Sequence, residues 1–291
     1  MTDTANIWLV ANPASGSNDE EALKALKSQC EERGLCLTRR IAFPREDLPT
    51  PAELDEAGIG IVAVFAGDGT INALITALEG WRGAVLVLPG GTMNLLSIRL
   101  HGEKTSSQIV DDVSRGATRR VRPAIVRCEA GTALAGLLVG PATAWGDVRE
   151  AMRDIDIPGF VGETIAAVEK STAGEMVRCV EPPAGSPDGY PLLMFTPEGL
   201  NDVGGADGHF SLKAYHADNV GDFMKQGLAI MRRNFREGPH DDLGNFEAMT
   251  LESAEGGALA LLIDGEAAEI SATARFETAT CGVDLIATAR G

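Results

Sequence analysis

The segment from Val64 to Asn72 constrains the fold of this chain more than any other. It reads Val-Phe-Ala-Gly-Asp-Gly-Thr-Ile-Asn and joins an apolar run, Ile59–Phe65, to a helix-like stretch, Ile71–Leu78. This order predicts a buried strand, a tight glycine turn and the start of a helix. Glycine lets backbone amides approach a phosphate closely, and a helix N-terminus attracts anions. The carboxylate of Asp68 suits a phosphate only through a divalent cation, so the segment predicts binding of a magnesium nucleotide.

The N-terminal part of the chain repeats this alternation of strand and helix. Strands are predicted over Ile7–Ala11, Leu35–Phe43, Ile59–Phe65 and Ala84–Leu88, with a helix from about Glu20 to Arg33. Strands that alternate with helices form a parallel sheet covered on both faces, so we expect a three-layer α/β domain over residues 1–122.

Two more turns follow predicted strands in this domain. One is Asn12-Pro13-Ala14-Ser15-Gly16, and the other is Leu88-Pro-Gly-Gly-Thr-Met-Asn94. Parallel sheets bind ligands at the carboxyl ends of their strands, so we expect all three turns to line one crevice. The sequence has neither the P-loop pattern G-x-x-x-x-G-K-S/T nor the dinucleotide pattern G-x-G-x-x-G, so these turns must hold phosphates in another way.

Residues 123–291 have a different pattern, with short apolar runs separated by Gly, Pro, Asp and Asn. The pattern predicts an antiparallel β domain, either a sandwich or a barrel, whose last strand or tail can return to the first domain. The runs are Ala124–Cys128, Thr132–Val139, Tyr190–Phe195, Phe210–Tyr215, Phe246–Leu251, Ala258–Ile263, Ala274–Phe276 and Val283–Thr288, and helical patches are predicted at about 147–153, 162–170 and 220–234.

Together, the three turns resemble the catalytic domain of the diacylglycerol kinase family, which includes bacterial lipid kinases and sphingosine and ceramide kinases. The late segment Ile263-Asp-Gly-Glu266 matches that family's C-terminal Asp-Gly-Glu motif, so the resemblance spans nearly the whole chain. It implies an α/β domain related to those of NAD kinases and phosphofructokinases, followed by a β-sandwich domain. It also implies transfer of the γ-phosphoryl group of ATP to the hydroxyl of a lipid such as diacylglycerol, ceramide or a sphingoid base.

The same resemblance assigns roles to individual residues. Asp68 would act through Mg²⁺, Glu266 would be the general base for the lipid hydroxyl, and Asp264 beside it would organise metal or nucleotide. Asp207, before Gly208, resembles the family's support for a structural Mg²⁺ site. For both Asp-Gly pairs, at 207–208 and at 264–265, an ordinary turn is the alternative. The residues that would hold the nucleotide are Asn12, Pro13, Ala14, Ser15, Gly16, Ala66, Gly67, Asp68, Gly69, Thr70, Asn72, Gly91, Thr92 and Asn94.

Two positions depart from the family pattern and keep other interpretations open. Ala66 stands where the family usually has Gly, and Leu95 stands where it commonly has Asp, so one carboxylate is missing and the number of metal ions stays open. These changes are the basis for one alternative interpretation, in which the chain is a catalytically weak regulatory protein that binds nucleotide or lipid. A second alternative is an NAD kinase-like phosphotransferase, which shares the Gly-Asp-Gly turn. The third turn favours a lipid kinase, and retention of Asp68, Asp264 and Glu266 favours an enzyme.

Composition limits the partners and the compartment. The net charge of −17 argues against a general nucleic-acid binder, which needs a basic face. The sequence has no signal-peptide pattern and no run of about 18 apolar residues, so we expect a cytoplasmic protein that visits membranes transiently to reach its lipid. The four histidines, His101, His209, His216 and His240, lack metal-ligand spacing and are expected at the surface or in turns. The oligomeric state stays open, with a homodimer as one option.

Overall fold

A computed structural model of the chain describes residues 6–12, 20–141, 176–202, 208–215 and 240–288. The helical patches predicted at 147–153, 162–170 and 220–234 lie outside these residues. The chain divides into two compact units. The first comprises residues 1–123, 199–206 and 280–291, and the second comprises residues 124–198 and 207–279.

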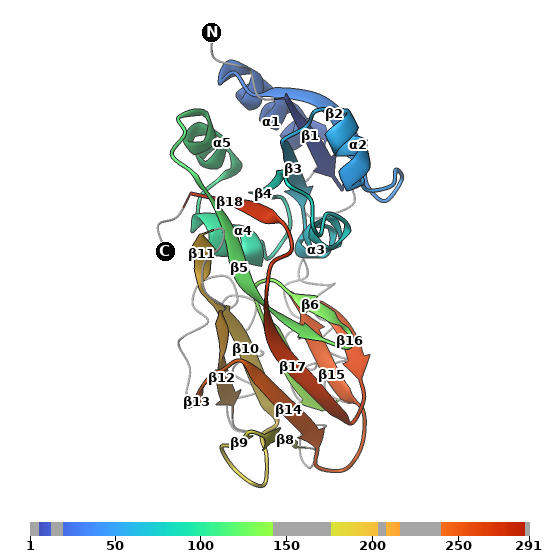
Figure 1. The fold of residues 1–291 in the computed structure, drawn as a ribbon, viewed down its shortest axis with the longest axis vertical. Helices are drawn as coiled ribbons and strands as arrows, with labels where there is room; N and C mark the ends of the chain where they lie inside the picture. The colour runs from blue at the N-terminus through green and yellow to red at the C-terminus, as the bar shows by residue number, and fades with distance from the viewer. Residues whose placement is uncertain (1–5, 13–19, 142–175, 203–207, 216–239, 289–291) are drawn as a thin grey trace, which may run out of the picture. The chain divides into compact units, whose positions relative to one another are not determined.

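The first unit is an α/β domain, as predicted. Its sheet has the order β2-β1-β3-β4-β18-β5, in which β1 to β4 and β18 are parallel neighbours and β5 is antiparallel to β18. Figure 1 shows α1 and α5 on one side of this sheet and α2 and α3 on the other. The elements are β1 (Asn6–Ala11), α1 (Glu20–Glu32), β2 (Cys36–Ala42), α2 (Pro51–Glu56), β3 (Ile61–Ala66), α3 (Asp68–Ala77), β4 (Ala84–Pro89), α4 (Leu95–His101), α5 (Ser106–Ser114), the first half of β5 (Arg119–Cys128), β11 (Leu200–Asp202) and β18 (Asp284–Ala287).

The central strands of this sheet are apolar at every position because helices cover both faces. Along β3, Val62 and Val64 are completely buried on one face, while Ala63 and Phe65 belong to the cluster under α1 and α5 on the other. A strand covered on both faces reads as a continuous apolar run. Burial of each large aliphatic side chain stabilises the fold by about 1.5–3 kcal/mol, so these runs fix the sheet.

Two helices that apolar periodicity does not predict begin instead with a capping box. At the start of α2, the Thr50 hydroxyl accepts from the Glu53 amide and the Glu53 carboxylate accepts from the Thr50 amide. Thr105 and Gln108 form the same reciprocal pair at the start of α5. Helices of six and nine residues are too short to show a clear period, so the Thr-x-x-Glu/Gln signal is the better predictor for them.

The second unit is a β-sandwich, the first of the two predicted architectures. One sheet has the order β13-β12-β10-β7-β15-β16, and the other has the order β5-β17-β14-β8-β9 with β6 beside β5. Both sheets contribute to one buried cluster, in which the ring centroid of Phe195 lies 5.0 Å from that of Phe210 and 4.8 Å from that of Phe276. The elements are the second half of β5, β6 (Gly131–Ala133), β7 (Leu137–Pro141), β8 (Val177–Glu181), β9 (Pro183–Ala184), β10 (Leu192–Glu198), β12 (His209–Tyr215), β13 (Asp241–Phe246), β14 (Ala248–Ser253), β15 (Leu259–Ile263), β16 (Glu266–Ile270) and β17 (Thr273–Thr280).

The prediction of a single strand over Thr132–Val139 is wrong. The structure divides it into β6 and β7, with a loop at 134–136 between them. The backbone amides of this loop donate to the carboxylate of Asp264 rather than to a neighbouring strand. The apolar run therefore breaks because of a distant side chain, which the local pattern does not reveal.

Candidate active site

The three predicted turns follow β1, β3 and β4, which are adjacent parallel strands of the first unit. Their carboxyl ends are in register, with Ala11 opposite Phe65 and Ala66 opposite Pro89. The turns therefore begin at the same edge of the sheet, as predicted. The Asn12 side-chain amide donates to the Thr70 hydroxyl across 3.2 Å, which joins the first turn to the start of α3.

The second and third turns approach each other so closely that a side chain cannot stand between them. A Cβ atom added to Gly91 would lie 2.5 Å from the Cα atom of Gly67, well inside the closest normal approach of two carbons. Glycine at position 91 is therefore required by this backbone contact. The second glycine of the Gly-Gly-Thr sequence after β4 is therefore explained by close packing of the backbone, and a role in phosphate binding is not needed to account for it.

Asn94 closes the third turn with its side chain. Its Oδ1 accepts from the Gly91 amide at 2.8 Å, and its Nδ2 donates to the Gly91 carbonyl at 2.9 Å. Its backbone is left-handed, with φ of 55°, a conformation that asparagine tolerates better than most residues. Asn94 thus builds the turn and occupies the cap position before α4.

Asp68 is the first residue of α3 and lies half-buried at the centre of this arrangement. Its Oδ1 accepts from the backbone amide of Leu96, at the beginning of α4, across 3.4 Å. A carboxylate beside helix starts is stabilised by their unpaired amides. Leu95, which replaces the family's usual Asp, is only 5% exposed and belongs to the core of the first unit.

The other predicted nucleotide-binding residues lie around these contacts. Thr92 is exposed in the third turn, Gly69 and Asn72 are half-buried in α3, and Ala66 is completely buried at the end of β3. Pro13, Ala14, Ser15, Gly16 and Asp207 lie outside the described residues. Within the described part of the chain, no group of three or more His, Cys, Asp or Glu side chains could hold a metal ion.

In the second unit, the dipeptide at 264–265 forms the hairpin turn between β15 and β16. Asp264 and Gly265 both have positive φ, 49° and 92°, which is the pattern of a type I′ turn and explains the Asp-Gly sequence. The turn also places Glu266 opposite Ile263 at the start of β16, where its side chain is exposed.

The Asp264 carboxylate is 5% exposed and accepts three backbone hydrogen bonds. One oxygen accepts from the Leu134 amide at 2.8 Å, and the other accepts from the Ala135 and Gly136 amides at 2.8 and 3.0 Å. The Asp264 amide in turn donates to the Gly136 carbonyl at 3.0 Å. Asp264 therefore fixes the hairpin that carries Glu266 to the loop before β7.

His101, expected at the surface, is instead buried in the first unit, so that prediction is wrong. Its Nε2 lies 3.0 Å from the Val87 carbonyl oxygen and its Nδ1 lies 3.1 Å from the Thr288 hydroxyl. A carbonyl only accepts, so Nε2 carries the proton and Nδ1 accepts from Thr288. Lys104 completes the network by donating to Thr288 and to Asp112. The network joins α4 to the strand that leads into the third turn.

The sequence that forms these three turns is similar to that of a known protein family. Residues 6–126, which contain all three turns, match the sequence profile described as the diacylglycerol kinase catalytic domain. The predicted resemblance to the diacylglycerol kinase family is confirmed over this part of the chain. No curated protein matches the sequence.

Solved structures share the diacylglycerol kinase fold over the whole chain. A crystal structure of a diacylglycerol kinase from Bacillus anthracis str. Sterne has a TM-score of 0.60 at 14% identity, covering 99% of this chain and 98% of that one. A second structure from that strain, provisionally described as a diacylglycerol kinase, has a TM-score of 0.61 at 15% identity with the same coverage. At these identities the likeness establishes the fold alone. Among the helices that the structure describes, none is long and apolar enough to cross a membrane.

Proposed function

We propose that this protein is an ATP- and Mg²⁺-dependent lipid kinase that transfers the γ-phosphoryl group to a lipid hydroxyl. The observation that carries the proposal is the meeting of Asn12, two glycine-containing turns and Asp68 at the carboxyl edge of one parallel sheet. Phosphoryl transfer depends mainly on positioning and charge neutralisation, so backbone amides, one metal ion and one base are sufficient.

The chemistry of the turns fits a triphosphate. Glycine at positions 67 and 91 leaves no side chain of these two residues beside a phosphate, and the Gly91 amide itself donates to Asn94. Asn94 closes the third turn by side-chain hydrogen bonds, and Asn12 joins the end of β1 to Thr70, so these points of the backbone are fixed before a nucleotide arrives. Preorganised amides stabilise developing negative charge without further reorganisation.

Asp68 is the residue that we propose for Mg²⁺. Magnesium keeps several waters and usually takes one or two protein carboxylates together with substrate phosphates, so a single carboxylate at the turn suits it. The bound ion would neutralise charge on the β- and γ-phosphate oxygens. The hydrogen bond from the Leu96 amide holds the Asp68 carboxylate in a defined orientation for that contact.

We propose Glu266 as the general base that accepts the proton of the lipid hydroxyl. Its exposure leaves the carboxylate accessible to a substrate, and the hydrogen bonds of Asp264 fix the turn beside it. In this proposal Asp264 acts as a positioning residue. The acceptor is a hydroxyl of diacylglycerol, ceramide or a sphingoid base, met during transient association of a cytoplasmic protein with a membrane.

The test is ADP release from MgATP with mixed micelles containing diacylglycerol, monoacylglycerol, ceramide or sphingosine, and separately with soluble NAD. Asp68→Asn and Glu266→Gln should each lower kcat at least about 100-fold, since each removes a group that acts on the reacting atoms. Asp47→Asn and Glu269→Gln are matched controls, because both residues are exposed and neither belongs to the proposed site.

The outcomes separate the competing functions. Activity on one lipid that is lost in both variants and kept in both controls supports the proposal and names the substrate. Activity on NAD alone would replace it with an NAD kinase-like phosphotransferase. MgATP binding without turnover of any acceptor would favour a regulatory protein and would point to the loss of a carboxylate at Leu95.

A further inference from the structure

A pocket of about 450 Å³ lies between α1 and β2, on the sheet face covered by α1 and α5. Because β2 is the terminal strand in the order of this sheet, the pocket lies at the sheet edge. Its volume is within the usual range for small-molecule sites. The residues that line it are Leu9, Glu20, Leu23, Lys24, Lys27, Leu37, Thr38, Arg39 and Arg40.

A β-bulge in β2 decides which of its charged residues is on the face of this pocket. Leu37 pairs with Ile7, but the next pair is Arg39 with Trp8, so Thr38 is an extra residue in β2. An extra residue reverses which side chains face each side of a sheet. Arg39 therefore shares the face of Trp8, with its guanidinium carbon 4.5 Å from the Trp8 ring centroid. Arg40 is opposite Leu9 on the α1 face, in the place that Arg39 would take without the bulge.

The pocket has an apolar floor. Leu9 is 4% exposed and Leu23 is 5% exposed, and both belong to the core cluster against which Leu37 packs. These three leucines come from β1, α1 and β2 and meet at the inner side of the pocket. A chain of methylene groups laid over them would remove mainly its own apolar surface from water, at about 25 cal/mol for each Å² buried.

The rim carries an excess of positive charge. The Arg40 guanidinium forms a two-pronged ion pair with Glu20, at 2.9 and 3.3 Å, so those two charges balance. Lys27 lies 3.8 Å from Glu31, but both side chains are about 60% exposed, and such a pair contributes little. Lys24 makes no hydrogen bond or ion pair with any residue that the structure describes. In a chain of net charge −17, this rim is locally attractive to anions.

We propose that the pocket between α1 and β2 binds a single-chain anionic amphiphile, an alkyl phosphate, with its chain over the leucines and its phosphate at Lys24 and Lys27. The two lysines are three residues apart on α1, which makes them neighbours on the helix surface. Ammonium groups bind phosphate as point charges, and the leucine floor supplies the affinity for the chain. The site is independent of the proposed kinase reaction, because none of its residues belongs to the three turns.

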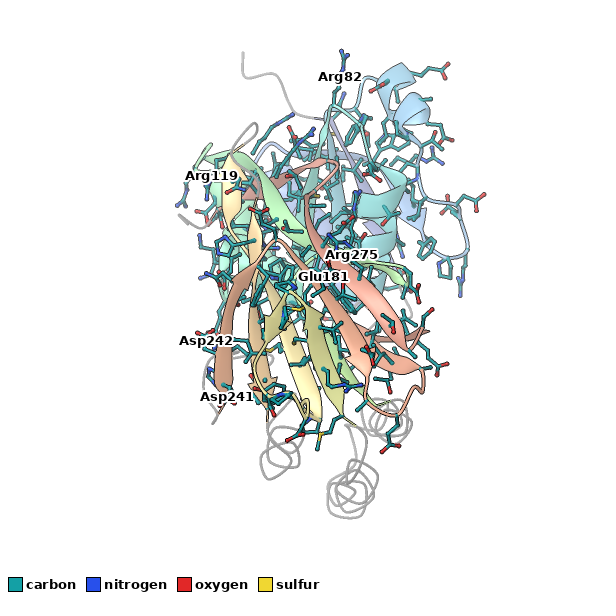
Figure 2. All side chains as sticks on the ribbon, turned by 60° about the horizontal axis from the view of Figure 1, so that its bottom comes forward. Arg82, Arg119, Glu181, Asp241, Asp242 and Arg275 are labelled. Carbon is teal, nitrogen blue, oxygen red and sulfur yellow. The ribbon has the colours of Figure 1, made fainter. Side chains whose placement is uncertain are left out.

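The experiment is isothermal titration of the full chain with decyl phosphate below its micelle concentration, with inorganic phosphate and decyl maltoside as separate ligands. The charge-reversed variant is Lys24→Glu/Lys27→Glu, and Lys24→Gln/Lys27→Gln serves if reversal disturbs folding. The matched control is Arg45→Glu/Arg275→Glu, which makes the same change of charge. Arg45 is exposed in a loop of the first unit, and Arg275 is exposed on β17 of the second (Figure 2).

We expect saturable binding of one decyl phosphate, weakened roughly tenfold or more in the lysine variants and unchanged in the control. Amide resonances of Leu37 and Thr38 should shift on titration, which places the ligand at the bulge. No binding of decyl phosphate, or equal binding by the lysine variants, would overturn the proposal. So would inorganic phosphate or decyl maltoside binding as tightly, because either would show that only one half of the amphiphile is recognised.

Discussion

His101 should make the stability of the first unit depend on pH in a defined window. The pKa of His101 is lowered from 6.5 to about 4, mainly by burial and less by the nearby Lys104 ammonium, while the hydrogen bond to Val87 and the Asp112 carboxylate oppose the shift. The folded protein therefore holds a neutral ring at pH values where the unfolded chain is protonated. Stability from this group is complete above about pH 6.5 and is lost as the pH falls from 6.5 towards 4.

The size of the effect follows from the two pKa values. A difference of this size corresponds to about 3 kcal/mol in total, of which about 2 kcal/mol is lost between pH 7 and pH 5. His101 is 1% exposed, so contact with solvent does not reduce the cost of protonating it in the folded state. A loss of about 2 kcal/mol is a large part of the stability of an ordinary domain.

The measurement compares the wild type with His101→Gln in urea unfolding at pH 7 and pH 5. Glutamine cannot titrate, so its destabilisation relative to the wild type should shrink by about 2 kcal/mol at the lower pH. Trp8 and Trp81 are buried in the same unit and report its unfolding by fluorescence. His209→Gln, at an exposed position of β12, is the matched control and should leave the pH dependence unchanged.

A second observable tests the same reasoning without unfolding the protein. Nitrogen NMR of the His101 ring should show the tautomer protonated at Nε2, and this state should persist at pH 5. If the ring titrates near pH 6.5, or if His101→Gln and the wild type lose stability in parallel between pH 7 and pH 5, the buried neutral histidine is refuted.

Two further substitutions test contacts that the structure identifies. Gly91→Ala should weaken MgATP binding at least about tenfold in calorimetry, because its Cβ would force Gly67 away, whereas Gly60→Ala meets no atom within 4 Å and should bind normally. Asp264→Asn should lower the free energy of unfolding by about 2–4 kcal/mol, since an amide cannot accept all three backbone hydrogen bonds, whereas Asp188→Asn at an exposed position should change it little.

Features that depend on local pattern were predictable from the sequence. Apolar runs such as Ile59–Phe65 identify strands covered on both faces, and the rule that parallel strands end at one edge brings Asn12, Gly67 and Gly91 together before any coordinates are known. Contacts between distant residues were not predictable in this way. The carboxylate of Asp264 binds amides about 130 residues earlier in the chain, and no spacing in the sequence signals that contact.

The bulge in β2 and the burial of His101 illustrate the same limit. Leu37 to Arg40 reads as an ordinary strand segment, and only the pairing with β1 reveals that Thr38 is the extra residue. His101 is polar and lies in a short helix, so its burial depends on acceptors and donors supplied by Val87 and Thr288. Tertiary structure decides these positions because each polar group is buried only where a partner satisfies it.

The structure also changes what the retained motif residues say about catalysis. Asn94 and Asp264 are satisfied by backbone groups that close a turn and hold a hairpin, so the fold requires them even in an inactive protein. Asp68 has a structural contact as well, through the Leu96 amide. Glu266 differs, because its exposed side chain makes no hydrogen bond or ion pair with any described residue, and a hairpin strand accepts many residues at such a position. Retention of Glu266 therefore favours an active kinase more strongly than retention of Asp264, and Glu266→Gln is the variant that best separates a kinase from a regulatory protein.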